Sequence, residues 1–478
     1  MLSGQSLRTK RAEVEFHNTT ALGQPETALA DYAEKNRRRG EFLSRHAERL
    51  GSLTPFLEIG ANAGHTSYLL ANEFAADGFA LDISADALRH GVHLMEMWGL
   101  DRSPVRLGGD ALRLPFHDNS LRFVVTYQTL GQFSGFEGVF QEARRVLAPG
   151  GIFLFAEEPL ARLLTLRLFS SPHVGEMSPW QRRLYQAGLL GYLVEDIIGS
   201  REEKLQGIHL NAGLSAREWR RLAGRYFEQV ELLFDAPGRG WGEACVKRLA
   251  LAGGRGRPDF AVEWLGGSVS GICRKAGPES STPFDRERFH EVLRCPDCEA
   301  SLWREASGDL RCEGCSYRAS HEQGVYNLLP SAEREELYPS PGEDVIDFSR
   351  PGHESQLLSG WYELEGAHGN RYRWIGGEAA ARLRPRRAQQ RRLRMRGYAP
   401  PDSFREKGSF LTVAFEVNGK PAGSTRLQRP GLFVHEANLP EASEYLLTIR
   451  AQPAFSVPGP DNRPRGVTIS LIRLIDEE

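Results

Sequence analysis

The apolar residues in the first quarter of the chain change period around one glycine-containing turn. A short apolar run, Phe56 to Ile59, stops at Gly60. Such a run bounded by glycine is typical of a buried parallel strand. From Tyr68 onward the apolar residues recur at helical spacing, so a helix is predicted after the turn. A strand, a glycine turn and a helix form the first unit of a nucleotide-binding α/β domain.

The same alternation of strand and helix patterns continues to residue 274. The later elements that the pattern predicts are a strand over 78–82, a strand within 120–128, a helix over 136–147, and strands over 152–156, 229–234 and 267–274. Ala148 to Gly151 forms a proline–glycine corner that ends the helix. The last two strands are expected to pair antiparallel and close the sheet. The pattern therefore predicts an α/β, Rossmann-like domain.

The spacing of the first turn distinguishes between nucleotide ligands. Gly60 and Gly64 are four residues apart, whereas the dinucleotide fingerprint puts its last glycine five residues after its first. With Glu58 two residues before the first glycine, the turn resembles motif I of the class I S-adenosylmethionine-dependent methyltransferases. The family's usual central glycine is Asn62 here. Asparagine accepts positive φ better than most residues, so the substitution is compatible with the turn.

Three further stretches carry the same resemblance. Asp82 ends the second strand 18 residues after Gly64, where an acid holds ribose hydroxyls in nucleotide-binding folds. Its alternative role is to cap the next helix, which Ser84 could do instead. Residues 109–125 resemble the family pattern "GDA…LPF.D.SFD.V", and residues 144–151 resemble its "RVLKPGG" corner. Together the four motifs span residues 54–159.

The resemblance implies a seven-stranded, mostly parallel sheet that binds S-adenosyl-L-methionine at the carboxyl ends of its strands. Asp110 would accept a hydrogen bond from the adenine amino group, and Ala111 would offer its amide to a ring nitrogen. The expected cofactor-binding residues are Glu58, Gly60, Asn62, Gly64, Asp82, Ile83, Asp110, Ala111, Tyr127 and Gln128. Besides Asn62, three features depart from the family pattern: Arg122 replaces an acid, Gly131 with Gln132 replaces a histidine pair, and Tyr127 and Gln128 follow Val125.

Methyl transfer needs a general base only where the acceptor must lose a proton. Glu158, at the end of a predicted strand, and His209 are the candidate catalytic residues. His209 lies in residues 160–214, a helix-rich stretch in the place where such enzymes insert an acceptor-binding cap. The methyltransferase domain is predicted to span 51–276, behind a polar helical segment over 1–50. The basic cluster from Lys35 to Arg39 is interpreted as a solvated helix face.

Two Cys-x-x-Cys pairs, separated by 13 intervening residues, lie in the second half of the chain. They are Cys295 with Cys298 and Cys312 with Cys315. Four thiolates can hold one tetrahedral Zn²⁺ and leave no open position, which predicts a structural metal site. Residues 290–331 resemble the small zinc-ribbon proteins that activate methyltransferases of the translation apparatus. A redox dithiol would need only one pair.

The last third of the chain has short strand patterns separated by turn signals. Residues 332–350 are expected to be a linker, and 351–478 a β-sandwich. Asn418–Gly419 predicts a hairpin turn. Arg392, Arg394 and Arg396 alternate with apolar residues, so they should share one face of a strand. That face is either a solvated surface or an anion-binding one. The region resembles, more loosely, β-sandwich modules of bacterial glycan-assembly enzymes.

Length, composition and net charge limit the number of domains and the classes of partner that the chain can have. The 478 residues, of which 40% are hydrophobic and 26% charged, predict about three domains of a soluble, cytoplasmic protein. The net charge of −2 gives no general attraction to nucleic acid or membrane. The most apolar helical stretch, 184–198, is too short for membrane insertion. The sequence thus favours a methyltransferase that O-methylates a sugar of a cell-surface glycan or its precursor. The alternatives are an RNA or translation-protein acceptor, and a non-catalytic scaffold in glycan assembly.

Overall fold

The computed structural model shows two compact units, which are described separately. The described residues are 7, 9–14, 25–133, 135–160, 180, 183, 214–235, 267–280, 283–367, 370–404, 410–456 and 462–476. The N-terminal unit contains Met1–Glu13 and Ala30–Ser331, and the C-terminal unit contains Val14–Leu29 and Ala332–Glu478. Among the described helices, none is long and apolar enough to cross a membrane.

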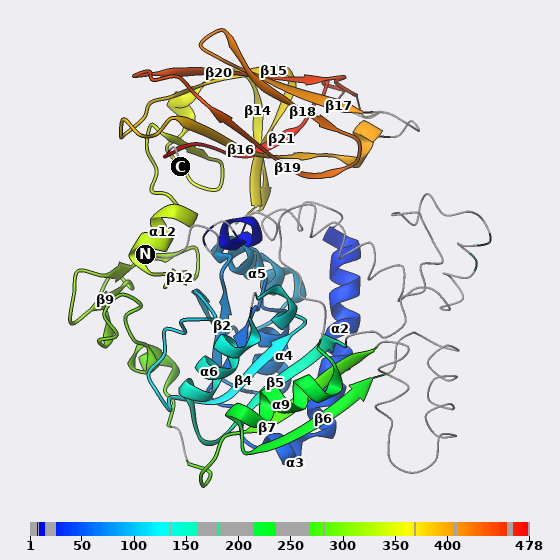
Figure 1. The fold of residues 1–478 in the computed structure, drawn as a ribbon, viewed down its shortest axis with the longest axis vertical. Helices are drawn as coiled ribbons and strands as arrows, with labels where there is room; N and C mark the ends of the chain where they lie inside the picture. The colour runs from blue at the N-terminus through cyan, green and yellow to red at the C-terminus, as the bar shows by residue number, and fades with distance from the viewer. Residues whose placement is uncertain are drawn as a thin grey trace. The chain divides into compact units, whose positions relative to one another are not determined.

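A nine-stranded sheet runs through the N-terminal unit (Figure 1). Its strands, in order across the sheet, are β11 (His321–Glu322), β12 (Val325–Asn327), β3 (Val105–Gly108), β2 (Gly78–Asp82), β1 (Phe56–Ile59), β4 (Leu121–Tyr127), β5 (Leu147–Pro159), β7 (Ser268–Arg274) and β6 (Gln229–Asp235). Neighbours from β12 to β5 are parallel, and β7 is antiparallel to both β5 and β6. The Rossmann-like sheet is confirmed. The expected seven strands are increased to nine by β11 and β12.

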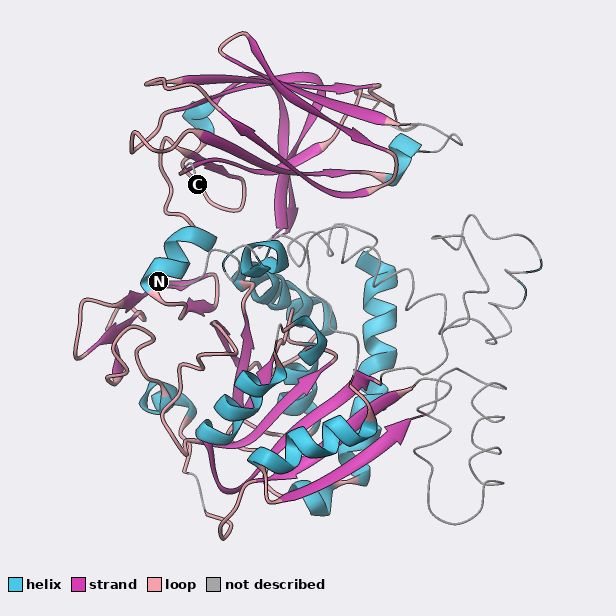
Figure 2. Ribbon diagram, in the orientation of Figure 1, coloured by secondary structure: helices cyan, strands magenta, loops and turns pink. Residues whose placement is uncertain are grey.

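Both faces of this sheet are buried. Along β4, Val124 enters one apolar core while Phe123 and Val125 enter the other. Such alternation, with both faces apolar, belongs to a parallel sheet covered on both sides. Helices α6 (Phe136–Val146) and α9 (Ala216–Tyr226) pack in the first core, and residues of α2 (Pro25–Arg45), α3 (Ala47–Leu50) and α4 (His65–Glu73) pack in the second. Figure 2 shows α6 and α9 crossing the sheet face that is turned to the viewer.

The segment with the two cysteine pairs is built into the β3 edge of this sheet. Its own sheet has three short strands, β8 (Leu302–Arg304), β9 (Leu310–Cys312) and β10 (Arg318–Ala319). Beyond them β12 pairs with β3, and the amide of Leu328 donates to the carbonyl of Gly108 at 2.7 Å. After the loop that follows β3, the amide of His117 donates to the carbonyl of Val292 at 3.0 Å. The cysteine segment therefore holds the loop after β3 at both ends.

The described strands of the C-terminal unit form one antiparallel sheet. Its order is β18 (Lys420–Leu427), β17 (Leu411–Val417), β20 (Tyr445–Gln452), β15 (Asn370–Leu383), β21 (Thr468–Ile475), β16 (Arg392–Ala399) and β19 (Gly431–Asn438), with β13 (Val345–Asp347) on β21 and β14 (Leu357–Ala367) on β15. The end strands β18 and β19 contact each other, so the sheet curls into a near-barrel. The expected antiparallel β architecture is confirmed, with its described strands joined in one curled sheet. The long strand β15 pairs with β14, β20 and β21 in turn and carries the pairing around the curve.

Two local predictions for this unit have opposite outcomes. The Asn418–Gly419 turn joins β17 to β18 with φ of 52° and 74°, the left-handed pair that a tight hairpin requires. By contrast, residues 332–350 are not only a linker, because they contain α12 (Ser331–Leu337) and β13. The Ile346 side chain is fully buried in the core of the unit, which is why this stretch is ordered as a strand.

The arginine row on β16 does not form an open cationic face. Leu393 and Met395 are buried behind it, as the alternation predicts. However, Arg392 and Arg394 both form ion pairs with Glu436 on β19. Arg396 is buried, and its Nε donates to Ser470 Oγ at 2.8 Å. Glu436 thus offsets part of the charge of Arg392 and Arg394, and burial withdraws Arg396, which makes this row less suited to binding anions.

Candidate functional site

The turn after β1 has the backbone geometry that its sequence predicts. Gly60, Asn62 and Gly64 all have positive φ, of 69°, 50° and 85°. A Cβ on Gly60 would lie 2.2 Å from Cγ2 of Thr129, so no larger residue fits there. Glu58 Oε2 accepts hydrogen bonds from the Ser67 amide at 2.7 Å and from the Ser67 hydroxyl at 2.5 Å. Glu58 therefore fixes the first turn of α4 against β1, and burial raises its pKa.

Asp82 connects the end of β2 to the same turn. Its Oδ2 accepts from the Asn62 amide at 2.7 Å, and its Oδ1 accepts from the Ser84 amide at 2.8 Å. Helix α5 (Ala85–Trp98) is capped by Ser84, whose hydroxyl accepts from the Ala87 amide. The capping role considered for Asp82 is thus filled by Ser84. Ile83 follows Asp82 directly in the connection to this helix.

Asp110 lies in the loop after β3 and is bound by the N-terminal segment. Its Oδ2 forms an ion pair of 2.7 Å with Lys10 Nζ, and its Oδ1 accepts from the Leu112 amide at 2.9 Å. Glu13 is also directed toward this region. Burial, and then the charges of Asp82 and Asp110, raise the pKa of Glu13 to about 8. Sequence reasoning missed both N-terminal residues, because nothing local to them indicates where they bind.

The end of β4 carries Tyr127 and Gln128. Tyr127 is buried, and its hydroxyl has no hydrogen-bond partner among the described residues. Gln128 is exposed and has a φ of 54°. Glu157, beside it in β5, has a φ of 60°. Strained backbone of this kind gathers at functional sites, because the surrounding structure must hold it in place.

Arg39 on α2 reaches this edge, although the sequence placed it in a solvated cluster. Its Nη1 donates to Thr66 Oγ1 at 2.8 Å, and its Nη2 donates to Glu157 Oε2 at 3.1 Å. Its guanidinium carbon lies 4.1 Å from the centroid of the Tyr127 ring. The neighbouring Arg37 and Arg38 are exposed and pair with Glu34 on the same helix. The solvated interpretation is therefore wrong for Arg39.

Glu158 is buried at the carboxyl end of β5. Its Oε1 accepts from the amides of Thr129 at 2.9 Å and Leu130 at 3.0 Å. Its Oε2 has no partner among the described residues. Burial raises the pKa of Glu158 to about 7, and hydrogen bonding by the backbone amides of Leu130, Thr129 and Gly131 opposes that shift. A carboxyl group that titrates near neutrality can accept a proton under physiological conditions.

The second catalytic candidate, His209, lies outside the described residues, as does most of the predicted cap. The two ends of that stretch meet beside Glu158, because Leu160 and Leu214 form a parallel bridge. Next to Leu214, a groove of ≈ 390 Å³ lies between α6 and α9, with Phe136 and Leu222 in its lining. Its volume falls within the range of small-molecule sites.

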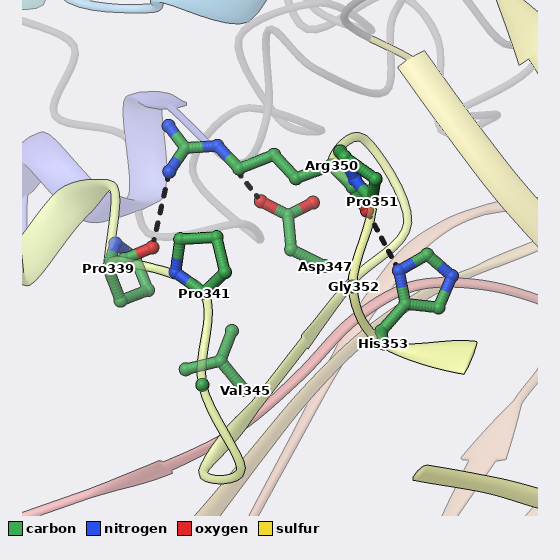
Figure 3. A pocket seen from close by; sticks show the side chains of 9 residues that line it. Pro339, Pro341, Val345, Asp347, Arg350, Pro351, Gly352 and His353 are labelled. Atoms are coloured by element: carbon green, nitrogen blue, oxygen red, sulfur yellow. Dashed lines mark hydrogen bonds and ion pairs between the residues drawn. The ribbon is translucent and has the colours of Figure 1, made fainter. Parts of the chain in front are cut away.

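A second hollow, in the C-terminal unit, is far smaller (Figure 3). It has a volume of ≈ 10 Å³, enough for one water molecule. Figure 3 shows Arg350 reaching the carbonyl of Pro339, while His353 Nδ1 lies 2.8 Å from the carbonyl of Arg350. These contacts close the loop over 339–353. The hollow is too small for a sugar.

The four paired cysteines converge at one point. Their sulfur atoms all lie within 4.8 Å of one another. Cys295 and Cys315 have their sulfurs 3.7 Å apart, and Cys298 and Cys312 have theirs 3.4 Å apart. A tetrahedral ion with Zn–S bonds of about 2.3 Å requires sulfurs roughly 3.8 Å apart. The geometry of the four side chains therefore fits one Zn²⁺.

Comparison with known proteins agrees with this assignment of elements. Residues 57–155 match a family described as methyltransferase domain. A probable phthiotriol/phenolphthiotriol dimycocerosates methyltransferase 2 of Mycobacterium ulcerans is 29% identical over 166 residues, which are 34% of this chain and 57% of that protein. A malonyl-[acyl-carrier protein] O-methyltransferase of Geobacter sulfurreducens is 33% identical over 102 residues, 21% of this chain and 37% of that protein. The matched part of this chain thus spans 57% of the length of the first of these relatives and 37% of the second.

Solved structures of methyltransferases resemble part of the chain. Geranyl diphosphate C-methyltransferase of Streptomyces coelicolor is 15% identical, covers 54% of this chain and 89% of its own, and has a TM-score of 0.34. Phosphoethanolamine N-methyltransferase 2 of Haemonchus contortus is also 15% identical, with coverages of 50% and 53% and a TM-score of 0.32. Because these TM-scores and identities are low, the evidence for the fold is the strand order of the sheet.

Proposed function

We propose that this chain is an S-adenosyl-L-methionine-dependent methyltransferase whose donor site is the carboxyl edge of β3, β2, β1 and β4. The observation that carries the proposal is the Gly60–Gly64 turn, which Asp82 at the end of the neighbouring strand holds through the Asn62 amide. Ligands of open α/β sheets bind at this edge. The unpartnered hydroxyl of Tyr127 is a further sign that a ligand belongs there.

Each part of the donor has a matching group along this edge. Asp82 would accept from the ribose hydroxyls and Asp110 from the adenine amino group, with the Ala111 amide facing a ring nitrogen. Glycine at position 60 would let the ligand approach the backbone closely. When bound, S-adenosyl-L-methionine supplies a methyl group carried on a sulfonium. The chain aligns the acceptor with that group, which is the main demand of an in-line displacement. When the donor binds, Lys10 would either share the Asp110 carboxylate with the adenine amino group or release it.

Glu158 is proposed as the general base for a hydroxyl acceptor. Its Oε1 is fixed by two backbone amides, so the free Oε2 is left to take the acceptor proton. A pKa of about 7 keeps a large share of this carboxyl group ionised at neutral pH. His209 stays an alternative base. The bridge between Leu160 and Leu214 supports placing the 160–214 cap over the same edge.

The favoured acceptor is a sugar hydroxyl of a cell-surface glycan or its precursor. Its support is the resemblance of the C-terminal unit to glycan-assembly modules, together with a base suited to an alcohol. Two tryptophans of the C-terminal unit have ring faces of the kind that stack on sugars, but Trp374 is buried, and Trp361 packs against the core and donates from Nε1 to the Ala380 carbonyl at 2.7 Å. A sugar would therefore bind near the cap of the N-terminal unit rather than on these rings.

Two alternatives to a glycan-methylating enzyme depend on other features of the chain. An RNA or translation-protein acceptor is suggested by the cysteine segment, although Glu436 already pairs with two of the arginines that would have met phosphates. A scaffold without catalysis would be favoured if Asn62, which replaces the family's glycine, disrupted the turn, but Asn62 adopts the required positive φ of 50°. For the metal, the Cys295, Cys298, Cys312 and Cys315 set would hold a structural Zn²⁺, because four thiolates complete its coordination.

The decisive experiment uses S-adenosyl-L-methionine with a labelled methyl group. The full-length protein is incubated with cellular glycan, RNA and protein fractions, and label transfer is measured against a Glu158→Gln control. Transfer to glycan alone supports the proposal, and transfer to RNA or protein would replace the favoured acceptor. Calorimetry without any acceptor then tests the donor site separately. Absence of donor binding would favour the scaffold.

A further inference from the structure

The donor site has a buried cation at the end opposite to Asp110. Adenine is assigned to Asp110 after β3 and ribose to Asp82 after β2, so the ligand extends along the edge toward β1 and β4. Neighbouring strands are about 4.8 Å apart, which puts β4 roughly 14 Å from β3. That span matches an extended donor molecule. Its amino-acid end therefore lies over β1 and β4, where Arg39 rests on the Tyr127 ring.

Arg39 has hydrogen-bonding capacity left at this position. A guanidinium has five N–H donors. Three of them are used, toward Thr66 Oγ1 and the two carboxylate oxygens of Glu157. The remaining two have no partner among the described residues. A carboxylate takes two parallel N–H donors from a guanidinium, which is the number that Arg39 still offers.

The surroundings hold the guanidinium rigidly in place. Arg39 is 8% exposed, and Thr66 and Tyr127 fix it from α4 and β4. Glu157 is held less tightly than these partners, because 27% of its side chain is exposed and its bonds to Arg39 are long, at 3.1 and 3.5 Å. A buried arginine with a planar donor fork is the usual means of binding a carboxylate.

We propose that Arg39 binds the α-carboxylate of the donor's methionine end and sets the donor's position along the sheet edge. This inference rests on the proposed donor site. It makes Arg39 a binding residue and Thr66 a positioning residue that orients the guanidinium. Glu157 then shares the guanidinium with the ligand or releases it. The ligand class is an α-amino acid attached to a nucleoside, and the group recognised is its carboxylate.

The test compares two ligands that differ only at this end. S-adenosylhomocysteine carries the amino acid, whereas 5′-methylthioadenosine keeps the adenosine and the sulfur but has no carboxylate. Calorimetry measures both affinities for the full-length wild type, Arg39→Gln and Arg39→Lys. Arg39→Gln should weaken S-adenosylhomocysteine roughly ten- to a hundredfold, as expected for lost charge-assisted hydrogen bonds, and should change methylthioadenosine by less than about threefold. Arg39→Lys keeps the charge but loses the fork and should give an intermediate loss.

The matched control is Arg38→Gln, one residue away on the same helix, where the arginine is exposed and pairs with Glu34. It should leave both affinities unchanged. Equal losses for the two ligands in Arg39→Gln would overturn the inference and show a role in folding or pocket shape. Unchanged binding of S-adenosylhomocysteine would also overturn it. If the wild type bound neither ligand, the proposed donor site itself would fail, which is a different result from either of these.

Discussion

The titration of Glu158 gives a prediction whose size follows from the structure. Burial raises the pKa of this carboxyl group from the ordinary value of 4.5 to about 7. With that value, about a tenth of the molecules carry an ionised Glu158 at pH 6 and about nine tenths at pH 8. If Glu158 Oε2 takes the acceptor proton, methyl transfer should rise about tenfold between these pH values and then level off. Glu158→Gln should lower the rate by about a hundredfold or more and remove this rise.

The same group predicts an effect on stability that needs no acceptor. Because the folded-state pKa is raised, the stability that Glu158 contributes is fully present below pH 4.5 and is lost as pH rises through 7. The shift corresponds to roughly 3 kcal/mol between these limits. Glu158→Gln cannot ionise, so its free energy of unfolding should fall less than that of the wild type between pH 5 and 8.

Denaturant unfolding at several pH values checks this difference, and a labelled-donor assay checks the rate. Glu228→Gln, an exposed carboxylate before β6, is the control and should behave as the wild type does in both. A rate that is independent of pH, or a variant with nearly full activity, would refute the role of Glu158 as base. Identical pH dependence of stability in the variant and the wild type would refute the raised pKa itself.

Three further predictions concern the donor turn and the cysteine segment. Asp82→Ala should weaken S-adenosyl-L-methionine binding by roughly 1–3 kcal/mol through loss of carboxylate hydrogen bonds, and calorimetry against exposed Asp101→Ala would show whether the loss is specific. Asn62→Gly should keep the wild-type affinity for the donor. Asn62→Val should weaken that affinity, because a β-branched residue is strained at a φ of 50°. Equal donor affinities of the two variants would contradict this prediction. Metal analysis should find about one Zn²⁺ per chain. Cys312→Ser or a strong chelator should lower the melting temperature of the N-terminal unit. Either change should also weaken donor binding, because β12 and Val292 of the cysteine segment hold the loop after β3. Unchanged donor binding after complete zinc removal would show that the two sites are independent.

The sequence by itself determined the elements whose chemistry is local. The apolar run before Gly60, the spacing to Gly64 and the Asn418–Gly419 turn depend on side chains within a few residues of one another. Backbone dihedral preferences and periodicity act over that range, so they can be read from a single sequence. The two cysteine pairs are similar, since each pair forms its own tight turn around two sulfurs.

Only the tertiary structure decided the environment of single side chains and the pairing of distant strands. Arg37 and Arg38 are exposed while Arg39 is buried beside Glu157, a difference that the basic cluster does not reveal. Sequence reasoning also gave no sign that β12 would extend the sheet at β3, because parallel pairing joins segments more than 200 residues apart. Charges depend on the same long-range contacts: Glu436 pairs with two arginines of another strand, and burial moves the pKa of Glu158 toward neutrality. Solvation and Coulomb forces act through space between groups that the fold brings together, so they follow from the folded arrangement and not from local order along the chain.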